Sequence, residues 1–469
     1  MIQLLILLHV FFVSFTDKPV DAGTQPALSP RAIEQRAKWH IALDELDYPV
    51  SAAYLDSLSR RVDSIHHTSR WMNGATCTMS EEMAAEVKQW DFVKDVQITR
   101  DDSPRGAFYM RRSLNAQQTT EQDVELVTER QLALYNLLPL HDMGYHGQGI
   151  LITICDGGFT NANTLDCFRH ELELGHFDFT DDVDDFYGYT GTHGTNCLST
   201  ISGLKEYEYY GSATRAQYYL MRSEENETES PKEMDNLVAA FEKADSLGTN
   251  IFSVSLGYAY FDNDEWTLGY DDLDGRSTRA SRAATIAARK GMLVCVAAGN
   301  EGDDDWRRIS VPADADSILT VGAMTVDSVM GAFSSFGPSA DGRTKPEVCA
   351  VGVQAALINP NNNVRRANGT SFATPLLAGL AATLWSALPD ENAMQIRERI
   401  IRSANHYSSP DPDNHYGYGI PDAYAAYLGR TATLADTPAT TRTTKYIQGN
   451  NIFIYRNGRT YSIYGILSE

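Results

Sequence analysis

The chain has 469 residues, of which 43% are hydrophobic and 22% are charged. This composition is ordinary for a globular protein, and the length exceeds what one hydrophobic core usually supports, so we expect a large domain with smaller attachments. The formal net charge of -23 would repel nucleic-acid phosphates and anionic membrane surfaces. These numbers argue against nucleic acid as a partner.

The first residues can be interpreted in two ways. Residues 2–15 form an apolar stretch that is short for a bilayer span and suits the core of a signal peptide, although no Lys or Arg precedes it. Residues 9–18 also carry the β-branched and aromatic side chains typical of a β-strand. No other run approaches the length of a membrane helix, so we expect a soluble body with no membrane span.

Residues 19–110 predict a compact α+β module. Pro30 fits the first turn of a helix, and Ser29 suits its N-cap. The Asn73-Gly74 pair is a strong turn signal between two strands. Helices are expected at 31–39, 51–61 and 80–90, and strands at 65–79, broken by this turn, and at 92–98. Residues 111–130 are polar with few apolar anchors, as in a linker.

Residues 131–430 predict a single α/β domain. Short apolar runs followed by glycine or by helical segments are typical of strands that are buried on both faces of a parallel sheet. After a Thr- and Ala-rich linker from residue 431, the Asn457-Gly458 pair predicts a β-hairpin before the C-terminus at 469. The expected strands of the parallel sheet are residues 150–156, 216–222, 250–257, 292–300 and 318–324.

In parallel sheets the catalytic and ligand-binding residues lie at the carboxyl ends of the strands, and two candidate site residues appear there. Asp156 ends the first expected strand, where an aspartate can also serve simply as a helix N-cap. Asn300 follows the fourth strand and Gly299, so its amide could donate to an anionic oxygen, although a turn asparagine usually bonds its own backbone.

Two further candidates stand at the starts of helices. His193, flanked by Gly191 and Gly194, precedes a run of small residues, and the field of a helix N-terminus there disfavours the charged imidazolium. Ser371 opens a long apolar helix, where its backbone N–H could point at a developing oxyanion. As plain structure it would be an N-cap serine.

Together these segments resemble the signature blocks of the subtilisin-like (subtilase, S8) serine peptidases. The matching blocks are DGG at 156–158, GTHGT at 191–195, SLG at 255–257, AAGN at 297–300 and NGTSFATP at 368–375. The order Asp, His, Ser is the one known for subtilisin. Two blocks depart from the commoner family pattern: DGG replaces Asp-Thr/Ser-Gly, and SFATP replaces Ser-Met-Ala-Thr/Ser-Pro. Both changes spare the reacting atoms.

The resemblance implies the roles of these residues. Asp156, His193 and Ser371 would be the catalytic triad, and Asn300 with Ser371 the oxyanion hole. The implied fold is a three-layer parallel-sheet catalytic domain. The substrate-binding walls would be Ser255, Leu256, Gly257, Ala297, Ala298 and Gly299, whose small residues leave room for a large apolar side chain.

The N-terminal region resembles the inhibitory propeptide of subtilases from Bacteroidota, in the segments 28–39, 69–73 and 92–98. This favours a strand at 9–18 preceded by a truncated leader. We therefore expect a secreted or cell-surface zymogen, with a ferredoxin-like propeptide within 1–110, a maturation site within 111–130 and the peptidase domain at 131–430. Residues 431–469 would end in a hairpin with a sorting role. The expected partners are protein or peptide substrates and the chain's own propeptide.

The six cysteines show no zinc-site spacing, so no structural metal clip is expected, and free buried thiols are the simplest interpretation. No cofactor is predicted. Calcium stays open as an alternative because residues 178–185, 262–266 and 302–306 are acidic, although such runs are more often solvated loops.

Three alternatives to the peptidase also remain. The first is a catalytically silent subtilase fold that serves as a binding module. The second is a peptide ligase with the same triad. The third is a nucleotide-binding α/β protein, which the absence of a Gly-rich phosphate fingerprint disfavours.

Overall fold

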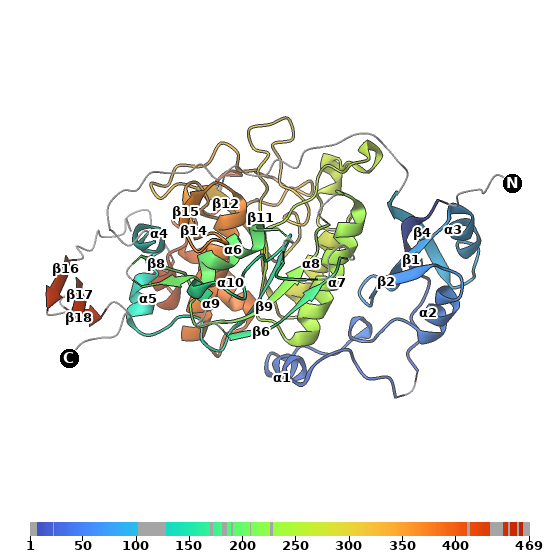
Figure 1. Cartoon of the computed structure of the whole chain (residues 1–469), viewed down its shortest axis with the longest axis horizontal. Coiled ribbons are helices and arrows are strands. Elements are labelled where there is room, and N and C mark those ends of the chain that lie inside the picture. Colours follow the sequence, from blue (N-terminus) through green and yellow to red (C-terminus); the bar gives the residue numbers. More distant parts are fainter. Residues whose placement is uncertain are drawn as a thin grey trace.

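The computed structural model shows an N-terminal module beside a large α/β domain, with a small sheet near the C-terminus (Figure 1). The structure describes residues 7–21, 23–101, 128–168, 172–180, 185–188, 191–206, 208–225, 228–409, 413–431, 444–448, 451–456 and 459–462. Residues 111–127 of the linker expected at 111–130 and the first six residues lie outside this described part.

The N-terminal module is built on a four-stranded sheet in the order β2-β3-β1-β4. The segment that could be a signal core or a strand is the inner strand β1, which pairs antiparallel with both β3 and β4. Its alternating apolar side chains pack on the module's own core. The elements are β1 (His9–Phe15), α2 (Ala52–Ser59), β2 (Ser64–Ser69), β3 (Gly74–Met79), α3 (Glu81–Val87) and β4 (Val93–Arg100).

Residues 16–51, here called the arm, leave this sheet and return to it. The arm carries α1 (Pro30–Lys38), which begins at the predicted N-cap, where the Ser29 hydroxyl accepts a hydrogen bond from Ala32 N. In Figure 1, α1 lies beneath α7 (Pro231–Leu247), away from the module's own sheet. The module thus touches the large domain in two places.

The large domain contains a seven-stranded parallel sheet in the order β13-β12-β11-β10-β5-β9-β6. Five of its strands are those that the apolar runs predict. The other two, β6 and β13, lie at the two edges of the sheet. The bounds are β5 (Leu151–Asp156), β6 (Leu172–Asp178), β9 (Gln217–Arg222), β10 (Ile251–Val254), β11 (Leu293–Ala297), β12 (Leu319–Met324) and β13 (Val348–Val351).

Helices cover both faces of this sheet, which gives the three layers that the resemblance implies. One face carries α6 (His193–Ser202), α9 (Thr370–Ala387) and α10 (Ala393–Ser403), and the other carries α7 and α8 (Arg279–Arg289). The module packs against α7. Smaller elements are α4 (Glu129–Ala133), α5 (Leu138–Asp142), α11 (Ala423–Tyr427), β7 (Leu204–Lys205), β8 (Tyr209–Tyr210), β14 (Ala355–Ile358) and β15 (Val364–Ala367).

The C-terminal hairpin is part of a three-stranded antiparallel sheet. Strands β17 (Asn451–Arg456) and β18 (Arg459–Ser462) flank the predicted turn, whose residues 457–458 lie outside the described part. A strand that the sequence did not suggest, β16 (Thr444–Gln448), pairs with β17. In the described residues, no helix combines the length and the apolar character needed to cross a bilayer.

Candidate active site

Asp156 is the last residue of β5, so it stands at the carboxyl edge of the sheet, and its side chain is fully buried. The Oδ1 atom accepts a hydrogen bond from Gly157 N and faces His193 Nδ1, each at 2.7 Å. The Oδ2 atom has no hydrogen-bond partner among the described residues. The carboxylate therefore orients the imidazole, with the ring proton on Nδ1.

His193 is the first residue of α6, and about a third of its side chain (35%) is exposed. Burial is the largest single influence and lowers the pKa of His193, but the charge of Asp156, the interaction with Cys197 and the hydrogen bonds to both together raise this pKa well above its usual range. The sequence suggested that the helix field keeps the ring neutral. In the structure the Asp156 carboxylate faces the ring, so it stabilises the imidazolium that forms when His193 takes up a proton.

Ser371 lies in the first turn of α9. Its hydroxyl donates to the carbonyl of Ser255 at 3.3 Å, and the Ser255 hydroxyl donates to the Ser371 carbonyl at 2.8 Å. The next side chain, Phe372, contacts the His193 ring with 5.7 Å between ring centroids, which brings the starts of α6 and α9 together. In this conformation the serine proton points to Ser255, and catalytic hydrogen bonds often tighten only when substrate binds.

Asn300 follows β11 and lies next to the start of α9, beside Ser371. Its Oδ1 atom accepts hydrogen bonds from Thr370 N (2.9 Å) and Thr370 Oγ1 (3.1 Å). The amide nitrogen Nδ2 makes no hydrogen bond with another described residue. Because Oδ1 is anchored next to Ser371, the amide is oriented and its donor group stays available for an anionic oxygen.

The expected substrate walls, 255–257 and 297–299, follow β10 and β11, which are neighbouring parallel strands. Ser310 lies between them. A Cβ atom added at Gly257 would be 2.8 Å from Ser310 Cβ, and one added at Gly299 would be 2.7 Å from Ser310 Oγ. A hydroxyl therefore stands between the two glycine-containing walls.

Glu301 adds a carboxylate beneath the second wall, a feature that the sequence analysis missed. Its Oε2 atom accepts hydrogen bonds from Asn300 N (2.8 Å), Ser335 Oγ (3.0 Å) and Ser310 Oγ (3.3 Å). Burial raises the pKa of Glu301. None of its described partners is a cation, so its charge is stabilised by dipoles alone.

Cys197 is a second residue that the sequence analysis missed at the site, although its i,i+4 spacing from His193 was a signal. Its Sγ atom lies 3.8 Å from His193 Nδ1 and donates to the Ser371 carbonyl at 3.3 Å. Burial raises the pKa of Cys197 to about 11, so the thiol stays protonated and is no rival nucleophile. All six cysteines are free and buried.

Two groups of side chains in the described part bring three potential metal ligands together: Asp156, His193 and Cys197, and separately Glu224, Glu229 and Glu233. In the first group the carboxylate faces the imidazole and the thiol is protonated. In the second, Glu233 accepts the backbone N–H groups of Glu225 and Ser230. The described residues of the acidic stretches suggested for calcium contribute to neither group.

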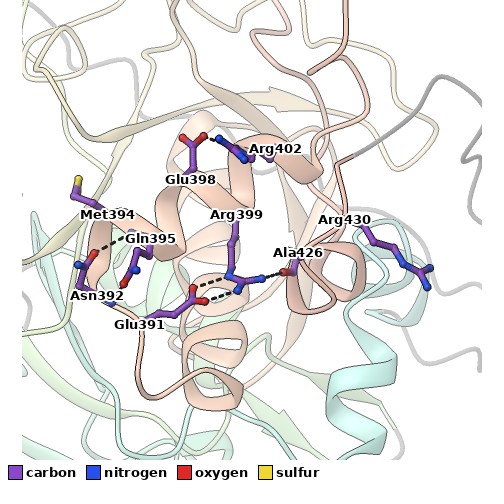
Figure 2. Close-up of a pocket in the computed structure, with 10 residues that line it drawn as sticks. Glu391, Asn392, Met394, Gln395, Glu398, Arg399, Arg402, Ala426 and Arg430 are labelled. Atoms are coloured by element: carbon purple, nitrogen blue, oxygen red, sulfur yellow. Dashed lines mark hydrogen bonds and ion pairs between the residues drawn. The ribbon is translucent and has the colours of Figure 1, made fainter.

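A pocket is formed by α10, α11 and the residues around them (Figure 2). Its charged side chains pair with one another, Arg399 with Glu391 and Arg402 with Glu398. No predicted site residue lines it.

Comparison with known proteins decides the family. The sequence model of the subtilase family matches residues 147–419, more than half of the chain. The chain belongs to the subtilase family. The model of the Bacteroidota peptidase S8 propeptide domain matches residues 10–121, so this subtilisin-like serine peptidase carries an N-terminal propeptide.

Individual relatives agree with this assignment. The chain is 24% identical to subtilisin NAT of Bacillus subtilis subsp. natto over 379 residues, which is 80% of this chain and 86% of that protein. It is 33% identical to serine protease AprX of Bacillus subtilis (strain 168) over 170 residues, 32% of this chain and 38% of that protein. The fold resembles the crystal structure of MycP1 from the ESX-1 type VII secretion system, with a TM-score of 0.54 and 20% identity over 71% of this chain and 94% of that one.

Proposed function

We propose that this subtilase is a secreted serine endopeptidase, made as an autoinhibited zymogen, in which Asp156, His193 and Ser371 form the catalytic triad. The observation that carries the proposal is the 2.7 Å contact between Asp156 Oδ1 and His193 Nδ1, at the edge where the first turn of α9 carries Ser371. That contact leaves Nε2 of the imidazole free to take the serine proton.

In this mechanism the Ser371 hydroxyl attacks the peptide carbonyl while His193 accepts its proton and later returns it to the leaving amine. Asp156 stabilises the imidazolium that forms. The Ser371 N–H and Asn300 Nδ2 would hold the oxyanion of the tetrahedral intermediate, and an acyl-enzyme follows. Water then releases the second product.

The zymogen part of the proposal rests on where the module ends. Arg100, the last residue of β4, pairs with Glu225 at 2.9 Å, and the neighbouring Glu224 lies 3.6 Å from a Cβ atom added at Gly157. The chain therefore leaves the propeptide close to the catalytic turn. We infer that the maturation site lies within residues 111–130 and that the domain boundaries are those expected from the sequence.

The pocket between the two walls would hold the substrate side chain that precedes the scissile bond. The sequence suggested a large apolar side chain there. The Ser310 hydroxyl and the Glu301 carboxylate limit the apolar depth and add negative charge, so we infer a preference for side chains that donate hydrogen bonds, lysine and arginine above all.

The central test compares the wild type with Ser371→Ala. The wild type should shorten to the size of the mature domain, hydrolyse casein and be labelled by a fluorophosphonate, whereas Ser371→Ala should stay full length, inactive and unlabelled. Losing a triad nucleophile costs about 10⁶-fold in kcat. Equal processing and activity of the two proteins would refute the assignment. Exported protein should appear outside the cytoplasm on fractionation.

A further inference from the structure

The turn that follows Asp156 consists of two glycines, so its own side chains cannot fix it. It is nevertheless enclosed. The carbonyl of Gly158 accepts a hydrogen bond from Gly194 N at 2.9 Å, in the first turn of α6. A Cβ atom added at Gly191 would lie 3.0 Å from the Gly157 carbonyl oxygen. The helix that carries His193 therefore rests directly on this turn.

A buried arginine holds the turn from the other side. Arg222, at the end of β9, has no exposed surface. It is the register partner of Asp156 on β5 and of Asp178 on β6, so it occupies the centre of the three strand ends. Its Nε atom donates to the Gly157 carbonyl at 3.2 Å.

A second guanidinium nitrogen is anchored at the end of β6 and just beyond it. This Nη1 atom donates to Thr180 Oγ1 at 2.6 Å and to Asp178 Oδ2 at 3.2 Å. A planar group with several donors in fixed directions can bond both sides at once, which a lysine ammonium cannot do with the same geometry. Because a buried cation is costly without such bonds, the side chain has little freedom to move.

We propose that Arg222 is a positioning residue for catalysis: through the Gly157 carbonyl it fixes the two-glycine turn, and the turn sets both the Asp156 carboxylate and the start of the helix that carries His193. The link to the carboxylate is direct, because Gly157 N donates to the same Asp156 Oδ1 atom that faces His193. This inference rests on the proposed roles of Asp156 and His193.

A purely structural arginine elsewhere in the domain provides the matched control. Arg397 on α10 also donates to a backbone carbonyl, that of Ile318 (2.8 Å), and pairs with one carboxylate, Glu347 (3.3 Å). It lines neither the site nor its supporting turn. Replacing it by methionine removes the same kind of bonds without touching Asp156 or His193.

Each protein is expressed as the full-length chain and allowed to mature. The experiment then measures kcat and KM for wild type, Arg222→Met, Arg222→Lys and Arg397→Met. Arg222→Met should lower kcat about tenfold or more with KM within about twofold, because orientation and not substrate binding is lost. Arg222→Lys should recover part of the loss, and Arg397→Met should keep kcat within about twofold even where its unfolding temperature falls equally. Equal kcat values for Arg222→Met and Arg397→Met would overturn the proposal. Should Arg222→Met not fold, wild-type kcat in Arg222→Lys would overturn it.

A second readout does not depend on catalysis. In full-length Ser371→Ala protein, the proton between Asp156 and His193 should give a low-field proton NMR signal, and adding Arg222→Met should shift or broaden it while Arg397→Met leaves it in place. An unchanged signal contradicts the positioning role. If the wild type proved inactive, the proposed function would fall, and this signal would still decide the role of Arg222.

Discussion

The Oδ2 atom of Asp156 has no hydrogen-bond partner among the described residues, and the glycine at position 157 has no side chain that could donate to it. A Cβ atom at position 157 would lie 3.6 Å or more from its nearest neighbours, so Gly157→Ser fits, and its hydroxyl can donate to the carboxylate. A donor stabilises the ionised carboxylate and weakens its hold on imidazolium, so the pKa of His193 should fall. The acid limb of the kcat/KM profile should then move to lower pH by roughly half a unit.

Gly157→Ala is the control for this prediction, because it adds the same bulk without a donor. The acid limb of its kcat/KM profile should coincide with that of the wild type. In both proteins this limb should lie above the ordinary pKa range of histidine, because Asp156 raises the pKa of His193. Identical profiles for the serine and alanine variants would show that Oδ2 does not need a donor from position 157.

The carboxylate of Glu301 predicts a preference for lysine or arginine before the scissile bond. Peptides with lysine before the scissile bond should lose about tenfold in kcat/KM in Glu301→Gln, since a charge-assisted hydrogen bond is worth about 1.5–3 kcal/mol. Peptides with phenylalanine there should be unaffected. Asp304→Asn, which removes a charge from the nearby loop, should change neither. A phenylalanine preference that is indifferent to Glu301→Gln would restore the apolar pocket expected from the sequence.

Sequence reasoning proposed Asp156, His193, Asn300 and Ser371 as site residues because each stands in a short motif whose neighbours are diagnostic. It missed Arg222, whose importance comes from strands that meet only in the fold. An arginine after an apolar run is usually exposed, and nothing local shows that this one is enclosed. Glu301 was overlooked for a similar reason, because the serines that bind it lie 9 and 34 positions away.

Among the elements, the arm behaves as a second anchor for the propeptide. Arg31 on α1 donates to Gly248 O (3.1 Å), Asn250 Oδ1 (2.9 Å) and Gln217 Oε1 (3.3 Å). These groups lie at the end of α7 and at the amino ends of β9 and β10, the edge of the sheet opposite to Asp156. The arm can therefore stay bound after the chain has been cut within the linker.

We predict that Arg31→Ala speeds dissociation of the cleaved module about tenfold, as expected when about three modest hydrogen bonds are lost. The measurement is the rate at which the N-terminal fragment separates from the mature domain on size exclusion. Arg60→Ala, in an exposed pair with Asp56 on the same module, is the control and should dissociate at the wild-type rate. Equal dissociation rates for both variants would mean that the contacts of the module's sheet alone hold the cleaved module on the mature domain.

The same elements show which parts of the fold a sequence can predict. Strands β5, β9, β10, β11 and β12 were found because strands buried on both faces are continuously apolar. The edge strand β6 mixes polar and apolar residues, since it has one neighbour, and β13 is a four-residue strand at the opposite edge. The equally short β10 was found because it lies inside a longer apolar run, residues 250–257. The contacts of the arm could not be predicted because they join residues more than 180 positions apart.

For the whole molecule, the interface between module and peptidase domain contains buried ionic pairs beside the apolar contacts of Trp71. Arg36 and Arg70 of the module share Asp245 of α7, and Arg70 also faces Glu242. Removing the module leaves these carboxylates without their cations on an already acidic domain. The charge of the mature domain therefore favours rebinding of arginine-bearing segments, its own propeptide first.

We predict that one histidine at this interface makes the assembly sensitive to pH. His67 on β2 places Nε2 at 2.9 Å from the Phe179 carbonyl and 3.0 Å from Asn236 Oδ1 in the peptidase domain, and burial lowers its pKa. A pKa lowered by docking means that His67 supports the complex fully above its free value of about 6.5 and loses that support as the pH falls. The positive charge of Lys232 also lowers the pKa of His67. Burial in the complex raises the pKa of Glu242, so protonation of Glu242 favours the complex as the pH falls, opposite to protonation of His67.

The comparison of wild type with His67→Gln isolates the histidine from these other groups. The cleaved wild-type module should dissociate faster as the pH is lowered from about 7.5 to about 5.5, across the ordinary histidine range. Glutamine keeps an N–H donor but cannot be protonated, so the pH dependence of His67→Gln should be flatter, or inverted by Glu242. Two parallel curves would assign any acid-induced release to other groups. Steeper release only in the wild type would make the propeptide a pH-controlled inhibitor held at two sites.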